Sequence, residues 1–168
     1  MDLVAIVEPS GGDYPGHMVI GQESETASKF FGFHLDGDLL PAEYREPERW
    51  QEFLYANRIL GEIREESSYV ERIRREKAKS LCEKRIVCDI PIETVIPLPA
   101  NWNHCAYYSF CPDDFHSDAD PCYNCVTWAT MIANKLVPGF ITPVRQGRIK
   151  LIVKQLKGIA RKKGKTDG

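Results

Sequence analysis

The sequence predicts an α+β protein, because short apolar segments of strand length come first and segments with helical spacing follow them. The chain has 168 residues, and one domain of this length buries roughly two thirds of the surface of its unfolded chain. Hydrophobic residues make up 43% of the sequence and charged residues 27%. This composition is typical of globular proteins and excludes a disordered or membrane-spanning chain.

Three strands are expected near the start of the chain. Residues 3–7 form an apolar run that ends at a proline and two glycines, as in a buried strand that is followed by a loop. Residues 17–22 and 29–35 are the next two candidates.

The segment SETAS between these last two strands is short enough for a hairpin connection. With Glu25 and Thr26 at the tip of the turn, His17 would lie directly opposite His34. Cross-strand partners on one face are about 5 Å apart, so the two imidazoles are expected to be neighbours. A register slip of one residue would place them on opposite faces.

The middle of the chain is predicted to be largely helical. Apolar residues recur at helical spacing over residues 47–63 and again over residues 67–81. Residues 84–99 are expected to form a strand that three prolines break into extended pieces. Residues 100–121 are interpreted as a long loop, which in a compact domain is more often functional than idle.

A helix is predicted to begin at the second cysteine of PCYNCVTWATMIANKL, which is Cys125. Either Asp120 or Asn124 could cap its start. The apolar side chains that would seat this helix in the core are Trp128, Ala129, Ile132 and Leu136.

The C-terminal end of the sequence is strongly basic. Nine lysines and arginines lie between residues 145 and 168, against a single acidic residue, Asp167. Such a segment is typical of a solvated terminus, although it could also contact phosphate, an anionic membrane surface or an acidic partner. The predicted organisation is a catalytic domain over residues 1–147 and a basic appendage over residues 148–168.

No signal peptide is predicted, because the start MDLVAIVEPSGG becomes acidic and glycine-rich within a dozen residues. No apolar run approaches the roughly 20 residues of a membrane span. The chain is expected to be made in the cytoplasm, and any export would use a route that reads no such signal.

Six cysteines leave several interpretations open: Cys82, Cys88, Cys105, Cys111, Cys122 and Cys125. Four of them, with His104 and His116 between them, could form a structural zinc site, although only the last pair has the close spacing of a zinc knuckle. Disulfides could form after export. A thioredoxin-like role is disfavoured, because its motif follows a strand.

The remaining interpretation is that Cys125 is a nucleophile. The free N–H groups in the first turn of a helix favour the thiolate form of a cysteine. A nucleophilic cysteine needs a base, and the predicted hairpin supplies two histidines. One of them, His17 or His34, could accept the proton while the other orients it.

The segments GHMVIG, FFGFH and YNCVTWA resemble those of circularly permuted papain-like proteins of the NlpC/P60 superfamily, in which the histidine strands precede the cysteine helix. Within it, they are most similar to papain-like effectors of the bacterial type VI secretion system. The resemblance covers residues 1–40 and 120–147. It implies a small antiparallel sheet packed against a cysteine-bearing helix, with Cys125 as nucleophile, His17 as base and His34 as the third polar residue.

The resemblance also implies an activity. Members of the superfamily mostly cleave amide bonds in peptidoglycan, so the chain is expected to be a secreted antibacterial peptidase or amidase that needs neither cofactor nor metal. Its partners would be a peptidoglycan peptide or protein substrate, an immunity protein and components of the secretion apparatus, with no specific nucleic acid. A deamidase, an acyltransferase or a thioesterase would use the same chemistry, and a non-catalytic zinc- or disulfide-stabilised binding module is the alternative from another class.

Overall fold

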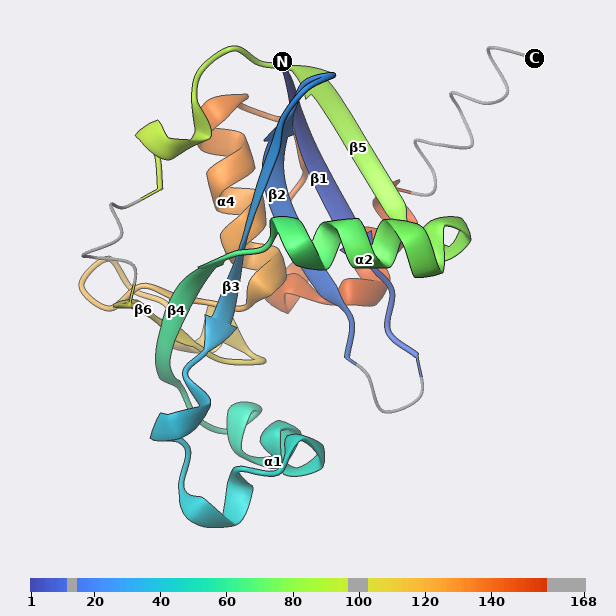
Figure 1. The fold of residues 1–168 in the computed structure, drawn as a ribbon. Helices are drawn as coiled ribbons and strands as arrows, with labels where there is room; N and C mark the ends of the chain where they lie inside the picture. The colour runs from blue at the N-terminus through green and yellow to red at the C-terminus, as the bar shows by residue number, and fades with distance from the viewer. Residues whose placement is uncertain (12–14, 97–102, 157–168) are drawn as a thin grey trace.

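The computed structural model describes residues 1–11, 15–96 and 103–156, with only the backbone described for residues 103–105. These residues form a seven-stranded sheet in the order β5-β1-β2-β3-β4-β6-β7 (Figure 1). Neighbouring strands are antiparallel except β6 and β7, which are parallel. The strands are β1 (Asp2–Glu8), β2 (His17–Glu23), β3 (Ser28–Leu35), β4 (Ile59–Glu65), β5 (Cys82–Val87), β6 (Asn103–Tyr108) and β7 (Cys122–Tyr123).

Helices lie on both faces of this sheet. The long ones are α2 and α4, which pack against opposite faces (Figure 1). The labelled helices are α1 (Trp50–Leu54), α2 (Ser67–Lys77), α3 (Pro112–Phe115) and α4 (Cys125–Leu136), and a further helix covers residues 149–156. The α+β class predicted from the sequence is confirmed, although the sheet is larger than expected and mixed.

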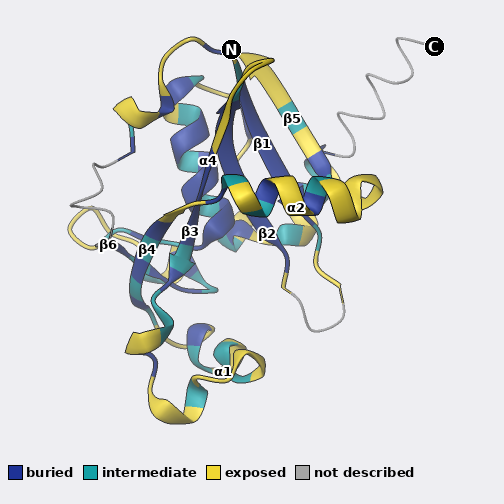
Figure 2. Cartoon of the chain, in the orientation of Figure 1, coloured by how far each residue is buried: buried dark blue, intermediate teal, exposed yellow. Residues whose placement is uncertain are grey.

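Strand β1 is apolar from Leu3 to Val7 because both of its faces are covered there. Leu3, Ala5 and Val7 face α4 and belong to the main core, whereas Val4 and Ile6 face α2 in a smaller second core. Side chains alternate between faces along a strand, so a run without polar residues indicates burial on both sides. Figure 2 shows β1 buried, while the edge strand β5 and the outer face of α2 are largely exposed.

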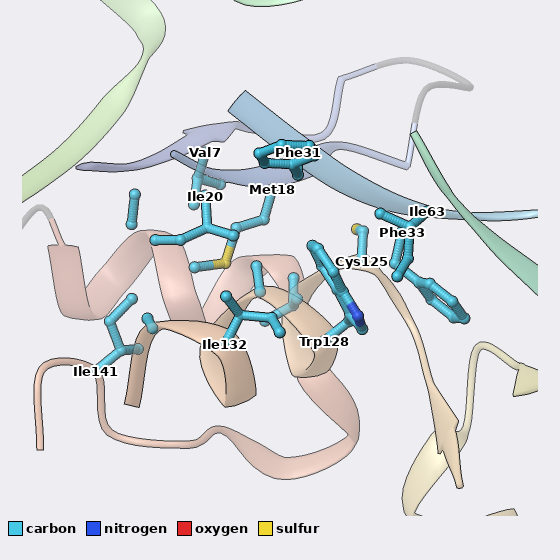
Figure 3. Packing of buried hydrophobic residues seen from close by; sticks show 14 of the residues in the cluster. Val7, Met18, Ile20, Phe31, Phe33, Ile63, Cys125, Trp128, Ile132 and Ile141 are labelled. Carbon is cyan, nitrogen blue, oxygen red and sulfur yellow. The ribbon is translucent and has the colours of Figure 1, made fainter. Parts of the chain in front are cut away.

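Helix α4 is held in the main core by the apolar stripe that the sequence predicts. Trp128, Ala129, Ile132 and Leu136 are all buried, and Trp128 stacks on Phe33 of β3 with ring centroids 6.0 Å apart. Figure 3 shows Trp128 and Ile132 packed between the helix and the strands. This packing fixes the position of Cys125, the first residue of the helix.

The sequence prediction of one helix over residues 47–63 is wrong in its second half. Only α1 and a short 3-10 turn before it are helical, and residues 59–65 form β4. Ile59, Gly61 and Ile63 are buried while the residues between them are more exposed, which is the alternation of a strand. The predicted loop over residues 100–121 is also wrong, since it contains β6 and α3.

The other predicted elements agree better with the structure. Helix α2 ends at Lys77 and a 3-10 turn continues to Ser80, within the predicted residues 67–81. The strand predicted over residues 84–99 is observed as β5 followed by a 3-10 turn, and its last residues, 97–99, lie outside the described residues.

The basic end of the chain is partly packed. Ile152 and Leu156 of the helix over residues 149–156 are buried in the main core. The core therefore includes residues beyond the domain boundary predicted at residue 147. Residues 157–168 lie outside the described residues. In the part of the chain that the structure describes, no helix combines the length and the hydrophobicity needed to span a membrane.

Candidate active site

Strands β2 and β3 pair at the hairpin end and separate toward their other ends. Their pairing runs from Glu23↔Ser28 to Ile20↔Phe31, in the register that the sequence predicts. Beyond this point β2 pairs only with β1, and β3 pairs only with β4. Figure 1 shows the two strands diverging there. His17 and His34 lie in the diverging segments, so they share a face of the sheet without being hydrogen-bonded partners.

Three polar side chains meet between these strands. The Nε2 atom of His17 lies 3.1 Å from Oε1 of Glu66, and Nε2 of His34 contacts the same Oε1 atom. The two imidazole centroids are 4.7 Å apart. One carboxylate oxygen therefore holds both histidines, and the neighbourhood of His17 and His34 expected from the sequence is found.

Glu66 reaches the histidines because it lies at the start of α2. It is the N-cap residue of that helix, and its backbone N–H donates to the carbonyl oxygen of Phe30 on β3 at 2.6 Å. The ring of Tyr69, in the first turn of α2, packs edge-on against His17 with centroids 5.3 Å apart. Packing of α2 on the sheet thus positions the carboxylate of Glu66.

Gly32 provides the room that this cluster needs. A Cβ atom on Gly32 would lie 2.7 Å from Oε1 of Glu66 and 3.1 Å from Nε2 of His17. A side-chain carbon does not approach a buried carboxylate oxygen so closely without displacing it. The GFH segment of β3 therefore supplies two features. His34 contacts the carboxylate of Glu66, and Gly32 leaves the space in which Glu66 and His17 meet.

Cys125 approaches His17 from the other face of the sheet. A side-chain hydrogen bond joins the Cys125 thiol to His17, and the Cys125 side chain points from α4 toward the strands (Figure 3). Glu66 comes from the α2 side. Because β2 and β3 have separated at this point, a sulfur on one side and a carboxylate on the other both reach the same imidazole.

These contacts set the charge of His17. Burial alone would lower the pKa of its imidazole, but the hydrogen bonds with Cys125 and Glu66 outweigh burial and raise this pKa to about 10. Burial likewise acts to raise the pKa of Glu66, whereas the hydrogen bond from His17 lowers it below its usual value. The geometry therefore favours an imidazolium at His17 paired with a carboxylate at Glu66.

His34 is in the opposite electrostatic situation. Burial and the positive charge on His17 lower the pKa of His34 to about 3. Two neighbouring imidazoles cannot both be charged at low cost, so His34 is the neutral member of the pair. It can orient the carboxylate of Glu66 without competing for the proton of Cys125.

A cleft of about 440 Å³ opens beside Cys125. Tyr55, Tyr108 and Phe110 form an aromatic part of its lining, and Arg148 and Lys150 contribute positive charge. Cys125 is 7% exposed and lines this cleft, so a small part of its surface is open to a substrate.

Asn124 connects the helix that carries Cys125 to one wall of the cleft. Its side-chain oxygen accepts from the Thr127 N–H at 2.9 Å, and the Thr127 hydroxyl accepts from the Asn124 N–H at 2.9 Å, which forms a capping box. The amide of Asn124 also donates to the carbonyl oxygen of Gln146 at 2.9 Å. Gly147 has a φ of +55°, and a Cβ there would lie 2.4 Å from Asn124 Oδ1. This wall therefore requires glycine at residue 147.

The structure brings together all three site residues predicted from the sequence, which are Cys125, His17 and His34. It adds Glu66, which the sequence reasoning missed. Glu66 precedes a charged helix within the run REESS, and nothing in that run distinguishes it from Glu65. The predicted choice between Asp120 and Asn124 as helix cap is resolved in favour of Asn124.

The other cysteines differ from Cys125. Among the described side chains, Cys88, Cys111, Cys122 and Cys125 are free thiols. Burial raises the pKa of Cys122 to about 11, an effect that Arg58 only partly offsets, so this thiol is unreactive near neutral pH. The side chains of His104 and Cys105, which belonged to the predicted zinc alternative, lie outside the described residues.

Comparison with protein-family models, with curated proteins and with solved structures gives no match for this chain.

Proposed function

We propose that the chain is a cysteine hydrolase with a permuted papain-like fold, in which Cys125, His17 and Glu66 act together on an amide bond. The observation that carries the proposal is the contact chain from the helix-start thiol of Cys125 through the buried His17 to the carboxylate of Glu66. Nucleophile, base and orienting residue in this order are the arrangement of a catalytic triad.

Each residue has a defined part in the proposed reaction. In the resting site the proton of Cys125 is held by His17, whose contacts favour the imidazolium, and the sulfur attacks the carbonyl carbon of the substrate. The backbone N–H of Cys125, in the first turn of α4, would donate to the oxyanion that forms. His17 then gives the proton to the leaving amine, which departs as the C–N bond breaks and leaves a thioester.

Water completes the reaction. His17 accepts a proton from a water molecule, and the resulting hydroxide attacks the thioester carbon. The C–S bond then breaks, the acid product departs, and the sulfur stays on Cys125 beside the protonated His17. Glu66 stabilises the imidazolium of His17 in both halves of the reaction, because its negative carboxylate contacts Nε2 of that ring. His34 is proposed as a positioning residue, because it contacts Glu66 and not the reacting atoms.

For the substrate we propose a peptidoglycan stem peptide, and for the biological role an exported antibacterial effector that an immunity protein neutralises in the producing cell. The resemblance of the cysteine and histidine segments supports this choice. The positive lining of the cleft, from Arg148 and Lys150, also favours acyl substrates that carry carboxylates. Deamidation or acyl transfer would use the same thioester intermediate.

The test is digestion of purified peptidoglycan by the wild type and by Cys125→Ala and His17→Ala, followed by mass analysis of the fragments. The wild type should release peptide fragments and both folded variants should release none, because each lacks one member of a unit that acts together. Cys122→Ala is the matched control and should cleave normally. Cleavage by folded Cys125→Ala would contradict the assignment, and no fragments from any form would favour a deamidase or an acyltransferase.

A further inference from the structure

We propose that His17, His34 and Glu66 also form a binding site for a divalent transition-metal ion, for which Zn²⁺ is the probe, and that an ion bound there switches off Cys125. The binding part of this proposal is independent of the proposed function. The inhibition part rests on it.

The arrangement of ligand atoms carries the proposal. One ligand atom from each of His17, His34 and Glu66 lies within 4.8 Å of the other two. Ligands on a tetrahedral zinc ion are about 3.3 Å apart, given Zn–N and Zn–O bonds of about 2.0–2.2 Å. The 3.1 Å separation between His17 Nε2 and Glu66 Oε1 already matches this spacing. Only His34, which contacts Glu66 more closely, needs to move outward.

The chemistry of the three groups suits such an ion. Two imidazole nitrogens and one carboxylate oxygen are the protein ligands of many zinc and iron sites, and they leave further coordination positions open. A divalent cation would also take over the compensation of the buried Glu66 carboxylate, which the imidazolium of His17 provides when no ion is bound. Arg64, the cation that acts on both His34 and Glu66, already forms an ion pair with Glu62 on β4. It therefore does not neutralise Glu66 alone.

Two of the three ligand side chains are buried, and the third is accessible enough to admit an ion. The side chains of His17 and Glu66 are 10% and 8% exposed and are therefore fixed by their surroundings, whereas the side chain of His34 is 25% exposed. An ion can arrive on the side of His34. Substrate would use the cleft beside Cys125, whose lining comes from other parts of the chain, so ion and substrate reach His17 from different directions.

Coordination would stop catalysis through the tautomer of His17. Nε2 of His17 faces Glu66, so Nδ1 is the nitrogen left for the thiol of Cys125. An imidazole bound to a metal through Nε2 is neutral and carries its proton on Nδ1. Such an imidazole can neither take up the proton of Cys125 nor serve as the imidazolium acid that protonates the leaving amine. Binding releases the protons held on the two Nε2 atoms, and removal of the ion restores the base.

The binding test uses Cys125→Ala protein, so that the nucleophile plays no part. We expect calorimetry of the metal-free protein with Zn²⁺ to show one bound equivalent that Glu66→Gln and His34→Gln each weaken by roughly tenfold or more, since each removes a ligand. His116→Gln replaces an exposed histidine outside the site. It should bind zinc as the parent does, which would show that weaker binding requires loss of a residue of the cluster. Equal zinc binding in all four proteins, or none in the parent, would refute the site.

The mode of binding has its own readout. Nitrogen NMR of the histidine rings should show Nε2 of His17 and His34 as the coordinating atoms and Nδ1 as protonated, a signature that a purely structural role for the cluster would not produce. With the active wild type, stoichiometric Zn²⁺ should inhibit turnover and EDTA should restore it. Coordination through Nδ1, or full activity at saturating zinc, would refute the switch. An inactive wild type would instead argue against the proposed function, while the calorimetry still decides whether the ion binds.

Discussion

Replacement of Glu66 by glutamine is the most informative single change, because Glu66 is the site residue that only the structure identifies. Glutamine keeps the size and shape of the side chain and removes its charge. The carboxylate is 8% exposed and bonds to two imidazoles at once. The glutamine amide would replace the negatively charged carboxylate, which only accepts hydrogen bonds, by a neutral oxygen that accepts and an NH2 group that donates.

The size of the effect follows from the bond that is lost. A hydrogen bond to a charged partner contributes about 1.5–3 kcal/mol. In the proposed reaction this energy stabilises the imidazolium of His17, which forms when Cys125 loses its proton. Since about 1.4 kcal/mol corresponds to a factor of ten, we expect kcat/KM to fall roughly 10- to 100-fold in Glu66→Gln. Cys125→Ala should show no activity at all.

Two measurements check this expectation. One is turnover of a peptidoglycan-derived peptide, and the other is the rate at which iodoacetamide alkylates Cys125, which needs no knowledge of the substrate. Glu65→Gln is the matched control, because Glu65 is the neighbouring glutamate and is exposed. If Glu66→Gln and Glu65→Gln alkylate and turn over at the same rate, Glu66 has no part in catalysis and the triad proposed here is wrong.

Three further outcomes are expected. Gly32→Ala should reduce activity at least tenfold and destabilise the fold by about 1–3 kcal/mol, because the Cβ of the alanine would displace Glu66. Gly37→Ala is the control: its Cβ would meet only an ordinary contact, so it should change neither activity nor the urea midpoint. Iodoacetamide should label Cys125 before Cys122, whose raised pKa keeps it protonated, and peptide mapping that finds Cys122 labelled first would contradict this. Asn124→Ala should lower the free energy of unfolding by about 1–2 kcal/mol through loss of the helix cap, and an unchanged urea midpoint would show that the capping box is dispensable.

The sequence predicts the hairpin and the cysteine helix well because their signals are local. Glu25 and Thr26 at a short turn set the register that places His17 near His34, and the spacing from Trp128 to Leu136 identifies the buried side of α4. Residues 59–63 mislead because Ile59 and Ile63, four residues apart, fit both helical spacing and strand alternation. Pairing with β3 and β6 decides between them, and no local pattern reports that pairing.

Glu66 could not be found for a related reason. A carboxylate joins the site only because α2 packs across the sheet and starts beside His17, 49 residues away in the sequence. The predicted boundary at residue 147 also overlooks a packed segment. Ile152 and Leu156 are buried in the main core, and Ile149 and Val153 pack against it. The prediction gives the positive charge of residues 145–168 more weight than this apolar spacing.

The separation of β2 and β3 is the feature on which the candidate site depends. In a continuous sheet, a side chain on one face cannot meet groups from the other, and His17 would contact either Cys125 or Glu66. Here the backbone pairing ends at Ile20 and Phe31, so the imidazole of His17 lies in the opening and meets the thiol on one side and the carboxylate on the other. Gly32 keeps the opening free of a side chain at the closest approach. The same opening leaves Nε2 of His17 facing a carboxylate and a second imidazole, so one local departure from regular pairing creates both the proposed triad and the proposed metal site.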